Sequence, residues 1–63
     1  MRVSTFYDDN SAVEGTLVRV SETGMLCTVL LDGGQTVMRH VARVTALDEP
    51  AHEALQHALK SAP

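Results

Sequence analysis

Short β-prone runs separated by turn-forming residues occupy most of the chain between residues 2 and 47, a pattern that predicts short antiparallel strands. The strongest local signal lies in residues 29–41, where two β-prone runs flank Asp32-Gly33-Gly34, a sequence typical of a hairpin turn. Glu22-Thr23-Gly24 predicts the turn that precedes this hairpin. The strands are expected near residues 2–7, 13–21, 25–31, 35–41 and 44–47.

The second of these strands contains a glycine in its interior. Gly15 at such a position predicts a β-bulge or a bend. Strict alternation along this strand places Val18 and Val20 on one face. Leu17 and Arg19 then share the opposite face.

The third strand is apolar at almost every position. Between Met25 and Leu31 only Thr28 is polar, so both faces of the strand are apolar. Such a strand is typical of the centre of a covered sheet or of the inside of a closed barrel. We therefore expect it to be buried on both faces.

The two aromatic residues of the chain, Phe6 and Tyr7, lie in the N-terminal segment. In an extended segment they point to opposite faces, so one of them is expected to pack inward. We assign the inward position, as a core anchor, to Phe6, and we expect Tyr7 to be an exposed contact residue. The turn-forming residues Asp8-Asp9-Asn10-Ser11 end this segment.

After the hairpin, three apolar residues follow one another at a spacing of three. Val41, Val44 and Leu47 fit neither a flat strand nor a long helix. A helical turn followed by a short strand would bury all three, and this is the arrangement we expect.

The last segment has the pattern of an amphipathic helix near residues 49–61. Asp48 or Glu49 can act as the N-cap, and a proline is tolerated in the first turn. Apolar residues then recur at the spacing of one helix face. They are Ala51, Ala54, Leu55, Ala58, Leu59 and Ala62.

Together these elements predict a mostly β fold with one C-terminal helix. The sheet is expected to form a small OB- or SH3-like β-barrel or a curled antiparallel meander. We expect residues 1–63 to form a single small domain. Within it, residues 1–12 are an N-terminal arm or strand, residues 13–47 the barrel core and residues 48–63 the helix.

The size of the chain limits its core. A domain of 63 residues buries only about 60% of the surface that its unfolded chain exposes, and many such domains add a disulfide, a metal or a partner subunit. Cys27 is the single cysteine, and the three histidines lack the spacing of a zinc site. We therefore consider a homodimer, in which a second copy covers an exposed sheet face or edge.

The charge balance argues against strong binding to nucleic acid. Eight acidic residues against five Lys and Arg give a net charge of −3, whereas affinity for nucleic acid comes mainly from Lys and Arg on phosphates. No apolar run approaches the ~20 residues of a membrane span, and the N-terminus lacks the apolar core of a secretory signal. With its single free cysteine, the chain is expected to be cytoplasmic and without membrane contact.

Potential cations gather at the end of the predicted hairpin, where Arg39, His40 and Arg43 lie within five residues. Such a cluster can contact an anion, a phosphate backbone or an acidic protein surface. Alternatively, these side chains are solvated and pair with Glu14 or Glu22 across the sheet. The candidate partner-binding residues are Tyr7, Arg19, Arg39, His40 and Arg43.

No group of residues indicates an enzyme. Cys27 lies in mid-strand, where a free cysteine is usually a small buried hydrophobic residue. His40 on the neighbouring strand raises the alternative of a thiol nucleophile. His52 and His57 point in different directions on the predicted helix and are not expected to share a metal. We expect no catalytic residue, no metal and no cofactor.

Three segments resemble the first three strands of bacterial translation initiation factor one, namely Glu14-Gly15-Thr16-Leu17-Val18, Met25-Leu26 and Val29-Leu30-Leu31-Asp32-Gly33-Gly34-Gln35-Thr36-Val37-Met38-Arg39-His40-Val41. That family has an EGxV strand and a VxLxNGxxVxAHI hairpin in an OB fold that binds RNA on the small ribosomal subunit. The resemblance therefore implies an RNA-binding barrel. After Val41, however, the family continues with a basic loop and two more strands, whereas this chain continues with Ala42-Arg43-Val44 and a helix. The pattern is also similar to that of SH3-like and Tudor-like barrels, which fit a shorter chain.

These observations lead to two main hypotheses of function. The first is a non-enzymatic binding module that docks on a larger protein as an adaptor, regulator or inhibitor, alone or as a homodimer. The second is an RNA- or single-strand-binding barrel that uses the arginines and His40, with Tyr7 as a stacking platform. A thiol enzyme based on Cys27 is a third alternative.

Overall fold

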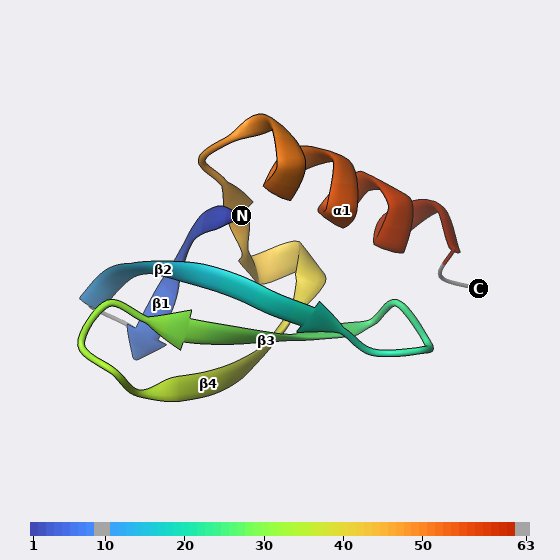
Figure 1. Ribbon diagram of the computed structural model, residues 1–63. Coiled ribbons are helices and arrows are strands. Elements are labelled where there is room, and N and C mark those ends of the chain that lie inside the picture. Colours follow the sequence, from blue (N-terminus) through green and yellow to red (C-terminus); the bar gives the residue numbers. More distant parts are fainter. Residues whose placement is uncertain (9–10, 62–63) are drawn as a thin grey trace.

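Five antiparallel strands and one C-terminal helix make up the fold in the computed structural model, which describes residues 1–8 and 11–61 (Figure 1). The predicted mostly β fold with a C-terminal helix is therefore confirmed. Asp9 and Asn10, at the centre of the predicted first turn, lie outside the described residues, as do Ala62 and Pro63. The elements are β1 (Arg2–Asp8), β2 (Ser11–Val20), β3 (Leu26–Leu31), β4 (Thr36–His40), the 3-10 turn η1 (Val41–Arg43), β5 (Thr45–Ala46) and α1 (Glu49–Ser61).

The strands form one sheet in the order β4-β3-β2-β1-β5. Strands β1 to β4 pair with their neighbours in sequence, and β5 returns to β1, where Ala46 pairs with Val3. This order is a curled meander and differs from the Greek key of an OB barrel. The turn η1 followed by the short β5 is the helical turn and short strand expected after the hairpin.

The β3–β4 hairpin forms around Asp32-Gly33-Gly34, as predicted. Gly34 has a φ of 97°, and its N–H donates to the Leu31 carbonyl (2.9 Å), while the Leu31 N–H donates to the Gln35 carbonyl (2.7 Å). A positive φ strongly favours glycine, so the second glycine of the turn has a backbone reason to be there.

The core lies between the inner face of the sheet and α1. Val41 and Val44 are buried in it as predicted, but Leu47 is exposed. Ala46 pairs with the buried Val3, so the next residue points to the other side of the strand. The buried hydrophobic residues are Val3, Leu17, Cys27, Val29, Leu31, Val41, Val44, Ala51, Leu55 and Ala58.

The prediction that the third strand is buried on both faces is wrong. Cys27, Val29 and Leu31 point into the core, whereas Leu26 and Leu30 are exposed on the outer side. Helix α1 lies on the inner side of the sheet (Figure 1). The outer side of β3 is therefore apolar and faces solvent.

Of the bulge or bend predicted at Gly15, the bulge lies at Val18 instead. The register between β2 and β3 shifts between Leu17 and Arg19, so Val18 and Arg19 both stand opposite Thr28. The extra residue turns Arg19 outward and returns Val20 to the inner face, where it packs against the core. The strict alternation expected of this strand is therefore wrong beyond Leu17.

Phe6 is not the core anchor that the sequence predicted. Thr5 is buried and Phe6, paired with Ala12 on the outer side, is 53% exposed. The Thr5 Oγ1 donates to the Arg43 carbonyl (3.0 Å), which satisfies the hydroxyl inside the protein and ties β1 to η1. Tyr7 is exposed, as predicted.

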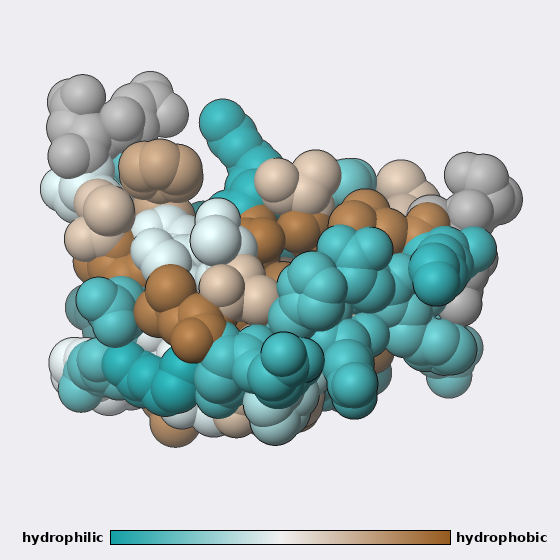
Figure 2. Space-filling model, turned by 90° about the horizontal axis from the view of Figure 1, so that it is seen from above, coloured by the Kyte–Doolittle hydropathy of each residue, from teal (hydrophilic) through white to brown (hydrophobic). Residues whose placement is uncertain are grey.

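Asp48, one of the two residues predicted for this role, is the N-cap of α1. Its Oδ1 accepts from the Ala51 N–H (2.9 Å) and its Oδ2 from the Arg2 N–H (2.9 Å), so one carboxylate joins the helix to β1. Ala51, Leu55 and Ala58 face the core, but Leu59 lies on the flank and is exposed. The polar residues of α1 face outward, and the surface over the helix is largely hydrophilic (Figure 2). Within the described residues, no helix has the length and hydrophobicity to span a membrane.

Candidate functional site

Two hollows meet at Tyr7, where the curled sheet opens at one end. We call them the apolar hollow and the basic hollow, and together the Tyr7 site. The apolar hollow, of about 460 Å³, is lined by Tyr7, Val13, Glu14, Leu31, Asp32, Gly33 and Gln35. The basic hollow, of about 350 Å³, is lined by Thr5, Phe6, Tyr7, Asp8, Arg39 and Arg43.

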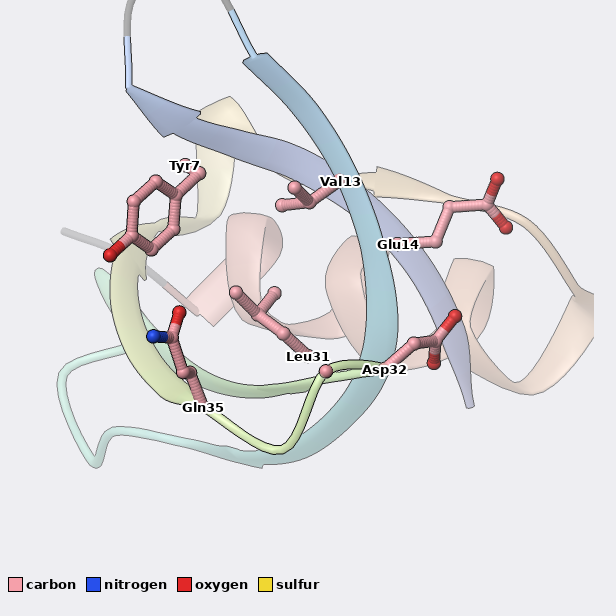
Figure 3. Close-up of a pocket in the computed structure, with 7 residues that line it drawn as sticks. Tyr7, Val13, Glu14, Leu31, Asp32 and Gln35 are labelled. Carbon is pink, nitrogen blue, oxygen red and sulfur yellow. The ribbon is translucent and has the colours of Figure 1, made fainter.

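The apolar hollow is built where β1 ends, β2 begins and the β3–β4 hairpin turns. Val13 and Leu31 point into it from adjacent strands, and Tyr7 forms the opposite wall (Figure 3). Glu14 and Asp32 line the edge but point away from the space. The interior of this hollow therefore offers aliphatic and aromatic contact, with polar groups at its edge.

The basic hollow owes its shape to Arg39, whose side chain bridges β4 and the end of β1. The Arg39 Nε donates to the Phe6 carbonyl (2.9 Å), Nη2 to the Tyr7 carbonyl (3.0 Å) and Nη1 to the Met38 carbonyl (2.7 Å). Strand β5 pairs only with Val3 and Ser4, so the guanidinium contacts the part of β1 that β5 does not reach. Arg39 is thus a structural bridge whose charge stays at the hollow.

Arg43 is exposed in η1, beside the basic hollow. No hydrogen bond or ion pair with another described residue engages its side chain. The bond from Thr5 to the Arg43 carbonyl holds its backbone close to β1. Of the five candidate residues, the structure therefore brings Tyr7, Arg39 and Arg43 together.

The two other candidates lie on the outer side of the sheet, away from these three. Arg19 stands opposite Thr28 and His40 stands opposite Leu26. The His40 Nδ1 accepts from the Ala42 N–H (3.1 Å), so this ring caps η1. His40 therefore has a structural task at the turn that the sequence did not indicate.

The expected pairing of these cations with Glu14 or Glu22 is not observed among the described residues. Glu14 lies 3.6 Å from Arg2, whose Nη1 and Nη2 donate to the two carboxylate oxygens of Asp32 (2.7 and 2.8 Å). These bonds hold the pKa of Asp32 below its ordinary value and raise that of Arg2. An ion-pair network thus links β1, β2 and the hairpin on the outer side.

Cys27 is a buried core residue, which is the usual role of a free cysteine in the middle of a strand. Its Sγ donates to the Arg39 carbonyl (3.4 Å), and burial raises the pKa of the thiol. Because Cys27 points inward and His40 outward, the two side chains lie on opposite faces of the sheet. The structure therefore does not pair the thiol with the imidazole.

Residues of metal-binding type are scattered over the surface and the core. Within residues 1–8 and 11–61, no group of three His, Cys, Asp or Glu side chains is placed to hold a metal ion. His52 and His57 are exposed on α1 beside Glu53, Gln56 and Lys60.

The sequence identified Tyr7, Arg39 and Arg43 but not the other residues that line the two hollows, among them Val13, Leu31 and Phe6. Val13 and Leu31 resemble ordinary core positions, and Phe6 was assigned to the core. The available signal was positional, because both aliphatic residues lie at strand ends next to turns, where a barrel opens. Comparison of the chain with protein-family models, curated proteins and solved structures returned no match.

Proposed function

We propose that this protein is a small non-enzymatic binding module that docks on a partner protein through the Tyr7 site. The occupant is an extended segment of the partner that carries an apolar side chain close to an acidic one. The main observation in support of this proposal is that Tyr7 lines both the apolar and the basic hollow. Because the hollows share this residue, a single short segment can reach both.

The apolar hollow supports the first half of this proposal. Its volume of about 460 Å³ lies in the ordinary range of ligand pockets, about 300–1,000 Å³. Val13 and Leu31 form an aliphatic base, and Tyr7 supplies a large rigid contact surface. Tyrosine is enriched among the residues that dominate binding energy at interfaces.

The basic hollow supports the second half of the proposal, the acidic side chain of the partner segment. It is lined by Arg39, Arg43 and Asp8, which leaves one formal positive charge in excess. Arg39 is held by three carbonyls, whereas Arg43 is exposed and can turn toward a carboxylate. A charge-assisted contact of this kind favours an acidic partner and speeds the encounter with it. We place this binding in the cytoplasm, because a single free cysteine is typical of proteins in that reducing compartment.

The direct experiment is selection from a displayed library of random peptides, followed by measured affinities for the enriched sequences. We expect enrichment of peptides with an apolar residue within a few positions of Asp or Glu. Tyr7→Ala should weaken their binding by about tenfold or more, because an aromatic anchor of an interface is lost. Arg43→Glu should weaken it by about tenfold through charge repulsion, equivalent to ~1.4 kcal/mol.

The matched control is Lys60→Glu, which makes the same charge reversal on the exposed side of α1. It should leave the affinity of the selected peptides unchanged. Failure to enrich any peptide contradicts the proposal, as does enrichment of peptides that bind Tyr7→Ala as tightly as the unchanged chain.

A second candidate function, binding of single-stranded nucleic acid, is favoured by one observation. Phe6 and Tyr7 line the same hollow as Arg39 and Arg43, and aromatic rings beside arginines are the usual means of binding unstacked bases. If the two arginines each contact one phosphate, a plot of log affinity against log salt concentration should have a slope of roughly −1.4. Anisotropy of a labelled single-stranded RNA tests this, and an affinity independent of salt rules it out.

A further inference from the structure

We propose that the outer face of β2, β3 and β4 is a contact surface between two copies of this chain. By the outer face we mean the four exposed apolar residues on the solvent side of these strands, Val18, Leu26, Leu30 and Met38. The four apolar residues lie outside the Tyr7 site, although Glu14 and Asp32 border both surfaces, and the proposal does not depend on the function proposed for that site.

The four side chains form one continuous patch. Each is between 41 and 60% exposed. Met38 faces Thr28 across the β3–β4 ladder and stands diagonal to Leu26 and Leu30, at the ~7–8 Å over which long side chains still interact. Val18 joins them from the bulge in β2. The positions between them are threonines, namely Thr16, Thr28 and Thr36.

In an antiparallel sheet with one solvated face, the outward-pointing positions are normally polar, whereas the outer positions of these strands carry four apolar residues separated only by threonines. Its middle carries no charged side chain, and β3 has the composition of a strand covered on both faces. Among the described residues, no element covers the patch, because α1 lies against the opposite side of the sheet (Figure 1). Exposed patches of this kind mark interaction surfaces.

The charges at the two ends of the patch identify the occupant as a second copy. Arg19 and His40 lie at one end, and Glu14 and Asp32 at the other. Arg2 neutralises one of these two carboxylates, so the acidic end keeps one negative charge. Asp32 is held by Arg2 through both of its oxygens, whereas Glu14 points away from the apolar hollow (Figure 3) and its side chain is 61% exposed, so Glu14 is the carboxylate that can meet a second copy.

A two-fold axis that lies between the two faces and perpendicular to the strands places the basic end of each copy over the acidic end of the other. Arg19 and Glu14 are five residues apart on β2, roughly 15–17 Å at the rise of a strand. When two outer faces pack with β2 antiparallel to its symmetry mate, Arg19 of each copy lies over Glu14 of the other, and the apolar patches meet between them. The face is therefore complementary to itself, as an isologous interface requires.

Sedimentation equilibrium over a dilution series tests this proposal. We expect a mass that approaches twice the 6.8 kDa of the chain as concentration rises. Met38→Glu, at the centre of the patch, should reduce the protein to a monomer. Leu59→Glu places the same charge on an exposed leucine of α1 and should leave the dimer intact. Circular dichroism of both variants shows that they are folded.

A charge exchange tests the orientation of the two copies. Arg19→Glu and Glu14→Arg should each weaken self-association severalfold, and the double variant should recover it, because each end then meets its opposite again. A monomeric unchanged chain at every concentration overturns the proposal and leaves the face to a different protein. A dimer that survives Met38→Glu, or a double variant weaker than both single variants, overturns it as well.

Discussion

Gly15 has the most restrictive environment of any glycine in the protein. A Cβ at this position would lie 2.4 Å from the Leu30 carbonyl oxygen and 2.9 Å from the Leu31 Cα. These are backbone atoms of the neighbouring strand, so they cannot move aside without moving β3. The absence of a side chain is what allows β2 and β3 to approach each other at this point.

We predict that Gly15→Ala lowers the free energy of unfolding by about 1–3 kcal/mol, the usual cost of forcing extra atoms into a packed site. Urea denaturation measures this change. Gly33→Ala is the control, because a Cβ there meets no atom within 4 Å, and it should change stability by less than about 0.5 kcal/mol. Equal effects of the two substitutions would contradict the steric account.

Residue-level errors of the sequence analysis have a common physical origin. Alternation gives the relative direction of neighbouring side chains, but it does not show where one extra residue is inserted. The bulge at Val18 therefore reversed the directions expected for Arg19 and Val20. Phe6 was assigned inward because one of two adjacent aromatic residues was expected to face the core, whereas the register of β1 gives the inward position to Thr5.

At the scale of elements, one side chain connects two strands of the curled sheet that do not pair with each other. Arg39 extends from β4 to carbonyl groups near the end of β1, beyond the reach of β5. The planar guanidinium donates in several directions at once, which the ammonium group of a lysine cannot reproduce in the same geometry.

We predict that Arg39→Lys lowers the free energy of unfolding by about 1 kcal/mol, since at least one charge-assisted bond to a carbonyl is lost at a partly exposed site. Arg43→Lys should have no measurable effect on stability, because the contact of that residue with β1 is made by its backbone. Thermal unfolding of the two variants distinguishes them. Equal melting temperatures would show that this connection does not stabilise the fold.

The N-cap of α1 makes stability depend on pH. The Arg2 and Ala51 N–H groups hold the pKa of Asp48 below its ordinary value of 3.8. A carboxyl whose pKa is lower in the folded state stabilises the protein above the unfolded pKa and loses this contribution as pH falls through the folded value. The hydrogen bonds from Arg2 likewise lower the pKa of Asp32, so this carboxylate contributes to stability over the same pH range.

We therefore predict that the urea midpoint falls as pH decreases below about 4, and that Asp48→Asn makes this fall smaller. Asparagine still caps a helix but does not titrate in this range. Glu53→Gln, on the exposed side of α1, should leave the fall unchanged. A midpoint that is constant down to about pH 2 would contradict this role of the two carboxylates.

Over the whole molecule, the sequence was most informative about local structure. The hairpin at Asp32-Gly33-Gly34 and the helix starting after Asp48 follow from turn and cap chemistry within a few residues. The Tyr7 site could not be derived in this way. It joins residues from the end of β1, the start of β2, the β3–β4 hairpin and η1, and it depends on how far the sheet curls. The curl of the sheet arises from long-range strand pairing and from the bulge, and no local sequence pattern indicates either of them.

The most direct test of the account is a map of backbone amide chemical shifts during titration with an apolar–acidic peptide from the library. The Tyr7 site predicts that the largest changes fall in four separate segments, residues 5–8, residues 13–14, residues 31–35 and η1. Changes concentrated on the outer face or on α1, or no change at a saturating concentration of peptide, would contradict it.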